Sequence, residues 1–219
     1  MKQNKRDLIL DAMQALMSED LASNASISDV AQRAGIAKGG IYYYFRSKDE
    51  ILDAVLERSY AQSIAESWSL VQSTDLNALA KMEKLFLLFL SPSATVKQHE
   101  MLKYLHLQND IVLHQKFLAL TIHELTPILS DILKQGVAEC MFTCPYPNQL
   151  SEIILSMLVV LFDHTIVPCE DNLETLQNKL KALALILEKT LGLPPESCSY
   201  FYTSPTFYQL AITNASSST

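Results

Sequence analysis

Apolar residues recur three and four positions apart along most of this chain, a spacing typical of amphipathic α-helices. The first such stretch predicts a helix that begins near Asn4 or Lys5 and ends between Glu19 and Asn24. Its predicted apolar face consists of Leu8, Ile9, Ala12, Met13, Ala15, Leu16 and Met17. We therefore expect the chain to open with a helix that has one apolar side.

A second, much shorter helix is predicted after Ser26. The residues from Ser26 to Asp29 offer an N-terminal cap, and Val30 and Ala31 begin an inward face. The pattern ends at Gly35 after barely two turns. Glycine accepts a positive φ at little cost, so Gly35 suits a tight turn between helices.

A third helix, also short, is predicted from about Lys38 to Phe45. Ile41 and Phe45 lie four positions apart and would form its buried face. Tyr42 and Tyr43 would then point outward. The pattern does not decide on which side Tyr44 lies.

A longer helix follows a capping box, with Ser47 at the cap and Glu50 at the third helical position. Two short helices joined by a glycine turn and braced by a helix on either side form a helix-turn-helix. In that motif the second short helix lies in the major groove of DNA. The pattern alone would also suit a tyrosine-rich packing element.

The chain after residue 60 predicts five or six further helices. One runs from Thr74 to Ser91, one from about 97 to 109, and one from about 111 to 141. The last of these is interrupted at Pro127, whose missing amide should kink it. Such a kink can border a ligand cavity or simply bend the helix.

Two long helices, at about 148–164 and 172–191, close the body. The first is apolar on almost every side, and the second repeats leucine at three and four. Two such helices in succession indicate an apolar face beyond the core of one protomer. The residues after 195 are aromatic up to Tyr208 and then polar, so we expect the first part of this tail to pack on the body and residues 214–219 to be mobile.

Composition agrees with an all-α fold. The 219 residues are 49% hydrophobic and include only five glycines, which favours helices around a buried core. The N-terminus has no apolar signal segment, and the apolar run from Ile153 to Phe162 is too short to cross a bilayer. We expect a soluble, cytoplasmic protein.

Charge is divided unevenly along the chain. The chain has 17 Lys or Arg and 24 Asp or Glu, and residues 1–52 hold seven of each kind. The remainder of the chain therefore holds 10 Lys or Arg and 17 Asp or Glu. The net charge is therefore 0 for the first segment and −7 for the second. Bulk charge does not indicate nucleic-acid binding, so any such function must rest on local placement.

Metal and redox chemistry find little support. The cysteines Cys140, Cys144, Cys169 and Cys198 contain no CxxC pair, and we expect buried, reduced thiols. A redox switch of Cys140 with Cys144 is the alternative. None of the five histidines has a partner at a zinc-ligand spacing, and we expect no metal.

Catalytic motifs are also missing from the sequence. It contains no glycine-rich phosphate loop, no GxSxG and no carboxylate pair that stands out from solvated charge. We expect neither an enzyme nor a cofactor.

The run from Ser26 to Leu52, SISDVAQRAGIAKGGIYYYFRSKDEIL, resembles the DNA-binding head of the TetR family of bacterial transcriptional regulators. The shared features are a serine-rich cap, a Val-Ala pair, Ala-Gly-Ile, Lys-Gly, Tyr-x-x-Phe and Lys-x-Glu. The remainder of the chain is similar to that family only in length and helical layout. The DNA-contacting residues that the resemblance implies are Ser26, Ser28, Lys38, Gly39, Gly40, Tyr42, Tyr43 and Lys48.

Gly40 departs from the family pattern, which commonly has Ser or Thr there. Between Ile36 and Phe45 the chain has no Arg, Asn, Gln, Asp or Glu, the side chains that give bidentate base recognition. Direct readout should therefore be sparse. We expect phosphate contacts, thymine-methyl contacts by tyrosine and DNA shape to supply much of the specificity.

The resemblance also implies an effector pocket and a homodimer in the helical body. The aromatic and apolar candidates for the pocket, which could equally be core residues, are Phe86, Phe89, Met101, Tyr104, Phe117, His123, Phe142 and Phe162. The candidates for a four-helix dimer interface are Ile153, Met157, Leu161, Leu176, Leu180, Leu183 and Leu187.

These observations predict three segments. Residues 1–50 form a helix-turn-helix head, 51–195 a helical ligand-binding and dimerisation domain, and 196–219 a C-terminal extension. The predicted function is a repressor that releases double-stranded, palindromic operator DNA on binding a small hydrophobic or amphipathic effector. Gly40 and the neutral head leave one alternative, a relative that binds no DNA and acts through a protein partner.

Overall fold

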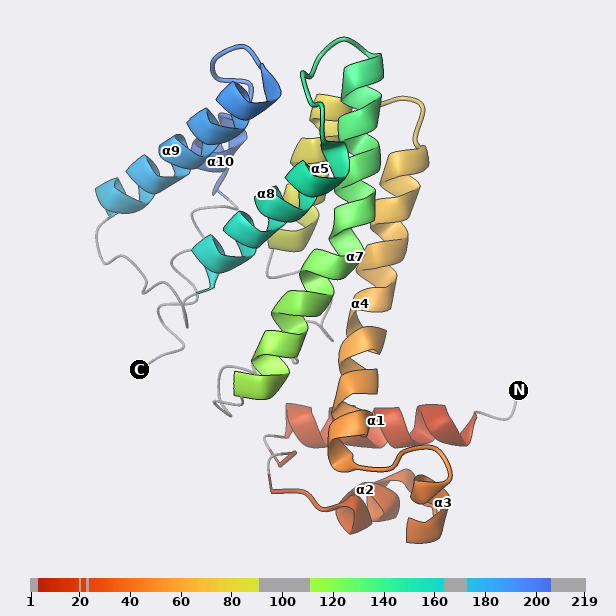
Figure 1. The fold of residues 1–219 in the computed structure, drawn as a ribbon. Coiled ribbons are helices and arrows are strands. Elements are labelled where there is room, and N and C mark those ends of the chain that lie inside the picture. Colours follow the sequence, from red (N-terminus) through yellow and green to blue (C-terminus); the bar gives the residue numbers. More distant parts are fainter. Residues whose placement is uncertain (1–3, 20, 23, 91–110, 164–172, 206–219) are drawn as a thin grey trace. The chain divides into compact units, whose positions relative to one another are not determined.

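The computed structural model describes residues 4–19, 21, 22, 24–90, 111–163 and 173–205, and their regular structure is helical throughout (Figure 1). The predicted all-α fold is confirmed. The described helices are α1 (Lys5–Ser18), α2 (Ile27–Ala34), α3 (Lys38–Tyr42), α4 (Lys48–Gln72), α5 (Ala78–Leu90), α7 (Ile111–Ala138), α8 (Pro147–Phe162), α9 (Leu173–Leu191) and α10 (Tyr200–Thr203). The helix predicted at 97–109 lies outside the described residues.

The chain forms two compact units. Unit 1 consists of residues 1–62 and 93–117, and unit 2 of residues 63–92 and 118–219. Helices α4 and α7 contribute residues to both units. No described helix is long and apolar enough to span a membrane.

The core of unit 1 is built on the apolar face of α1. Asn4 caps this helix by accepting the amide of Arg6 at 3.2 Å. Leu10 is fully buried, whereas Leu8, which we had placed on the apolar face, is only partly covered. The fully buried α1 residues Ile9, Leu10 and Met13 recur at the spacing of one helical face.

Polar contacts join the helices of unit 1. Arg58 on α4 donates to Asp11 at 2.7 Å and to Gln14 at 2.8 Å, both on α1. Lys116 on α7 pairs with Asp53 on α4 at 2.7 Å. These partly exposed ion pairs link α1 and α7 to α4, and each contributes little to stability.

Unit 2 packs its helices around one apolar cluster. Phe201 of α10 is fully buried, and its ring centroid lies 5.6 Å from that of Phe86 on α5. Residues from α7, α8 and α9 complete the cluster, among them Ile128, Leu129, Leu158, Leu183 and Leu187. Three residues of the predicted extension, Cys198, Tyr200 and Phe201, therefore belong to the core of unit 2.

Helix α7 continues through Pro127 rather than ending there. Pro127 is exposed, and its lack of an amide removes one hydrogen bond from the helix. The helix ends three residues earlier than the sequence pattern predicted, at Ala138. The amides of Met141 and Phe142 both bond to the carbonyl oxygen of Gly136, at 2.9 and 3.0 Å, and close the turn.

Helices α8 and α9 lie side by side and antiparallel in unit 2 (Figure 1). The amide of Thr143, just before α8, donates to the carbonyl oxygen of Leu191 at the end of α9, at 2.8 Å. Each helix buries one face in the core and leaves apolar residues on the opposite face. These exposed residues are Ile153 and Val160 on α8 and Leu185 and Ile186 on α9.

Candidate nucleic-acid interface

Helix α2 begins with the capping arrangement that the sequence predicted. The Ser26 hydroxyl oxygen accepts the Asp29 amide at 3.3 Å, and the Asp29 carboxylate accepts the Ser26 amide at 2.7 Å. The Ser26 hydroxyl also donates to this carboxylate at 2.7 Å. Hydrogen bonds from the hydroxyl and amide of Ser26 lower the pKa of Asp29. Ser26 thus fixes the start of α2, besides any contact with DNA.

Gly35 makes the turn between α2 and α3, as the sequence predicted. Its φ is +67°, in the left-handed region that glycine adopts most readily. The amide of Ile36 donates to the carbonyl oxygen of Ala31 at 3.1 Å, which completes the helix end. This turn sets the direction in which α3 leaves α2.

Helix α3 shows which of its side chains face outward. Ile41 is fully buried and Phe45, just after the helix, is 3% exposed, whereas Tyr42 is 50% and Tyr43 83% exposed. The helix ends at Tyr42, three residues earlier than predicted. The division of the four residues into inward and outward pairs agrees with the prediction from their spacing.

Two aromatic contacts lie at the end of α3. Tyr44 is half-buried, and its ring meets that of Tyr43 edge-to-face with centroids 4.9 Å apart. The guanidinium carbon of Arg6 lies 5.4 Å from the centroid of Phe45. The second contact links the end of α3 to α1.

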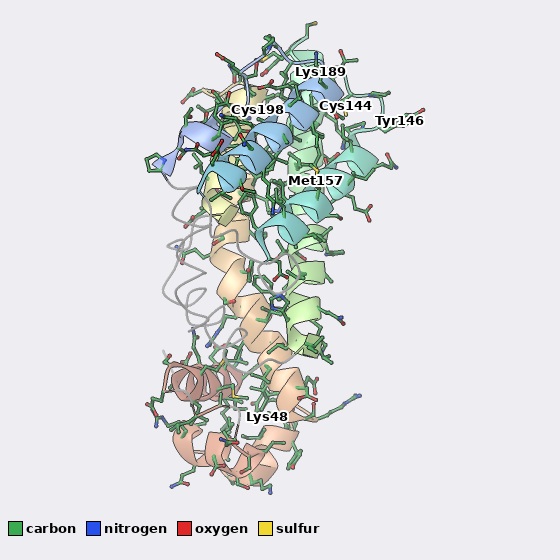
Figure 2. All side chains as sticks on the ribbon, turned by 90° about the vertical axis from the view of Figure 1, so that its left-hand side faces the viewer. Lys48, Cys144, Tyr146, Met157, Lys189 and Cys198 are labelled. Carbon is green, nitrogen blue, oxygen red and sulfur yellow. The ribbon has the colours of Figure 1, made fainter. Side chains whose placement is uncertain are left out.

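Helix α4 begins at Lys48, one residue after its predicted cap (Figure 2). The Ser47 hydroxyl oxygen accepts the Glu50 amide at 3.1 Å, as a capping box requires. The Glu50 carboxylate, however, accepts the amide of Arg46 at 2.6 Å rather than that of Ser47. This contact fixes the backbone at Arg46, immediately before the helix.

Three cations of unit 1 lie in or near α3 in the sequence. Lys38 and Arg46 are exposed, and Lys48 is half-buried. The uncharged candidates Ser28 and Gly39 are exposed as well. Arg46 was absent from our predicted set, although its place two residues before Lys48 could have indicated it. Of the carboxylates nearby, Asp29 and Glu50 accept backbone amides in helix caps.

The predicted pocket residues do not share one environment. Phe86 and Phe142 are buried in the core of unit 2, and Phe162 packs against that core. His123 has a side chain that is 83% exposed. Phe117 belongs to unit 1, where its ring lies 5.3 Å from that of Tyr60. Met101, Tyr104 and the side chain of Phe89 lie outside the described residues.

The predicted dimer residues divide into three groups. Leu180, Leu183 and Leu187 are buried in the core of unit 2. Ile153 is 63% exposed. Met157 (Figure 2), Leu161 and Leu176 are partly buried against the core.

The two cysteines considered as a redox pair differ sharply. Cys140 is exposed and has a φ of +58°, whereas Cys144 is buried (Figure 2). Burial raises the pKa of the Cys144 thiol, and it raises that of Cys198 to about 11. Because the thiolate is the reactive form, Cys144 and Cys198 are poor nucleophiles. No group of metal-ligating side chains occurs among the described residues.

Comparison with known protein families identifies the N-terminal segment and the helical body that follows it. Residues 9–55 match the model of the bacterial regulatory proteins of the tetR family, and residues 93–186 match the tetracyclin repressor-like C-terminal domain. The chain belongs to the TetR family. The first match contains α2, α3 and the start of α4, so Tyr42 ends the second helix of a TetR-type helix-turn-helix and Tyr43 directly follows it.

Relatives of this TetR-family protein are transcriptional regulators. An uncharacterized HTH-type transcriptional regulator of Bacillus subtilis, YvdT, is 42% identical over 53 residues, which are 24% of this chain and 27% of the relative. The HTH-type transcriptional repressor KstR2 of Mycobacterium tuberculosis is 30% identical over 84 residues, 38% of this chain and 42% of the relative. The matches thus span between about a quarter and two fifths of these relatives.

A solved structure extends the likeness in fold to most of the TetR-family chain. SmeT, the repressor of the Stenotrophomonas maltophilia multidrug efflux pump SmeDEF, aligns with a TM-score of 0.58 at 17% identity. The alignment covers 86% of this chain and 91% of SmeT. A structure of SmeT with triclosan aligns with the same TM-score.

Proposed function

We propose that this protein is a homodimeric transcriptional repressor that binds operator DNA through α3 and releases it on binding a small apolar or amphipathic molecule. The observation that carries the proposal is the arrangement of α3. Ile41 and Phe45 anchor it, while Tyr42 and Tyr43 are exposed in a segment that matches the tetR family. In a helix-turn-helix these outward side chains face the major groove.

Phosphate contacts come from the cations and polar groups around α3. Lys38 and Arg46 are exposed, and Lys48 begins α4. Ser28, Tyr43 and the amide of Gly39 add uncharged donors. Such contacts position the protein on the duplex and make its affinity fall steeply with salt concentration.

Dimerisation uses the exposed sides of α8 and α9. Ile153, Val160, Leu185 and Ile186 form the outer apolar face of these two neighbouring helices. Burying them against a second copy removes apolar area from water. A two-fold dimer places its recognition helices on half-sites about 34 Å apart, one turn of DNA, which suits a palindromic operator.

The effector binds within the helical body of unit 2. Support comes from the match to the tetracyclin repressor-like C-terminal domain and from the fold shared with SmeT, which has been solved with triclosan. The effector acts by binding the DNA-free conformation more tightly than the DNA-bound one. The predominantly apolar core of unit 2 favours a hydrophobic or amphipathic molecule.

A gel-shift experiment with the full-length protein and the DNA upstream of its own gene tests this function. We expect a specific complex whose affinity falls at least about 100-fold between 50 and 200 mM salt. Lys38→Ala should weaken it, while Lys84→Ala, which removes an exposed cation on α5, should not. If no salt-sensitive specific complex forms with this or any selected duplex, the alternative of a protein-binding relative replaces the proposal.

A further inference from the structure

Gly39 and Gly40 lie within α3, although glycine is a poor helix former. Positive φ values among the glycines occur at Gly35 and Gly192, so Gly39 and Gly40 have ordinary helical backbone. Apart from the adjoining residues and the backbone of α3 itself, a Cβ added at either position would have no heavy atom of the described residues within 4 Å. The fold of the head therefore requires glycine at neither position.

The other glycines have internal reasons for being glycine. Gly35 needs its positive φ for the turn into α3. Gly136 needs to lack a Cβ, because a Cβ there would lie 2.0 Å from the Phe142 ring. The glycine pair in α3 differs, because no contact or backbone angle among the described residues explains its lack of side chains.

The cost to α3 makes this difference meaningful. The helix has only five residues, and its N-cap, Ala37, forms no side-chain capping bond. Two glycines weaken such a helix further, because they gain more freedom than alanine when it unwinds. A feature that weakens the recognition helix without serving the fold points to a partner that uses the bare backbone.

The surroundings of Gly40 indicate what that partner group is. Residues three apart lie on the same side of a helix, so Gly40 shares a side of α3 with Tyr43, which is 83% exposed. No side-chain atom of that tyrosine lies within 4 Å of a Cβ built at Gly40, so the bare position is open. From Ile36 to Phe45 no amide, carboxylate or guanidinium side chain is available to bond a base edge. The apolar feature of the major groove is the 5-methyl group of thymine.

We propose that the bare backbone at Gly40 receives the 5-methyl group of one thymine in each half-site, so that glycine at this position selects a T·A pair. This inference rests on the proposed function and specifies which base pair the same site reads. A hydroxyl or methyl side chain at position 40 would occupy the space of the thymine methyl. Specificity at this position comes from an absent side chain.

The proposal is tested by adding a methyl group to the protein at position 40 and by removing the methyl group of thymine from the DNA. A duplex is first selected from a random library by the full-length wild-type protein, and each symmetry-related pair of thymines, one in each half-site, is then replaced together by deoxyuridine, which lacks the methyl. We expect Gly40→Ala to bind the thymine duplex roughly tenfold more weakly, and one deoxyuridine duplex to restore most of that affinity. The wild type should bind that same duplex more weakly than its thymine parent.

Two controls make the result specific. Ala119→Ser, at an exposed position of α7, should leave all affinities unchanged. The thermal midpoint of Gly40→Ala should not fall below that of the wild type, because alanine favours the helix. The inference is overturned if Gly40→Ala binds the thymine duplex like the wild type, or if no duplex with a paired deoxyuridine replacement restores its affinity. Failure of the wild type to enrich any sequence overturns the proposed function instead.

Discussion

The Ser26 hydroxyl oxygen and the Asp29 amide lie 3.3 Å apart, and the Asp29 carboxylate returns a 2.7 Å contact to the Ser26 amide. This reciprocal pair satisfies amides at the start of α2 that the helix itself cannot pair. It therefore determines where the first helix of the helix-turn-helix begins.

Ser26→Ala should lower the free energy of unfolding by about 1 kcal/mol, because the cap loses its side-chain acceptor. Ser26→Asp, which keeps an acceptor at the cap, should lower it less. Urea denaturation followed by circular dichroism measures both changes. An unchanged unfolding midpoint in Ser26→Ala would contradict the role of this cap.

The same pair predicts a dependence on acid. The folded state lowers the pKa of Asp29, so the carboxylate stabilises the fold above the unfolded pKa. That stabilisation is lost as the pH falls through the lowered folded pKa, below about 4. Asp29→Asn should therefore lose less stability than the wild type on acidification. Parallel slopes for the two proteins between pH 5 and 2 would contradict this account.

Tyr42→Ala should weaken operator binding and relax its sequence preference, because an exposed ring of α3 is lost without disturbing the core. We expect a loss of about 1 to 3 kcal/mol in binding free energy at the operator and much less on random DNA. Anisotropy titrations on both duplexes measure it. Tyr146→Ala, which removes an exposed tyrosine before α8, is the matched control (Figure 2). Equal affinities of Tyr42→Ala and wild type would remove this tyrosine from the interface.

Lys81 is 2% exposed, and its ammonium donates to the carbonyl oxygen of Val71 at 2.6 Å and to the side-chain oxygen of Gln135 at 2.7 Å. Lys81→Met should cost about 1 to 3 kcal/mol, since it leaves these acceptors without that donor. Lys84→Met, at an exposed position of the same helix, should change stability by less than about 0.5 kcal/mol. Similar unfolding midpoints for the two variants would show that the contacts of Lys81 add nothing.

Gly136→Ala should destabilise unit 2 by about 1 to 3 kcal/mol, because the new Cβ overlaps the ring of Phe142. The double change Gly136→Ala with Phe142→Leu removes that overlap. It should therefore cost less than the sum of the two single changes, as a double-mutant cycle of chemical denaturation can measure. Simple additivity would place the strain elsewhere.

Leu185→Glu should convert the dimer into monomers, because it places a charge on the proposed apolar interface. The protomer should stay folded, since Leu185 is 54% exposed and outside the core. Sedimentation velocity gives the mass and circular dichroism the helix content. Val137→Glu, a similar change at an exposed position of α7, should leave the dimer intact. A dimeric Leu185→Glu protein would exclude this face as the interface.

The sequence by itself determined the helical class, the positions of α1 to α4 and the division of α3 into inward and outward residues. These features depend on local physics, namely apolar periodicity, caps such as Ser26 and Ser47, and the positive φ of Gly35. Because these features are set by interactions between residues close together in the sequence, they can be predicted without knowing the tertiary structure.

Only the tertiary structure decided which leucines of α9 are internal. Periodicity shows that Leu180, Leu183 and Leu187 share a face, but it cannot say whether that face meets the same protomer or another. The structure buries all three in the core of unit 2 and leaves Leu185 and Ile186 exposed. Nor could spacing show that Lys81 is buried, because its partner Gln135 lies 54 residues away in the chain. Long-range packing sets these environments, and local pattern does not encode it.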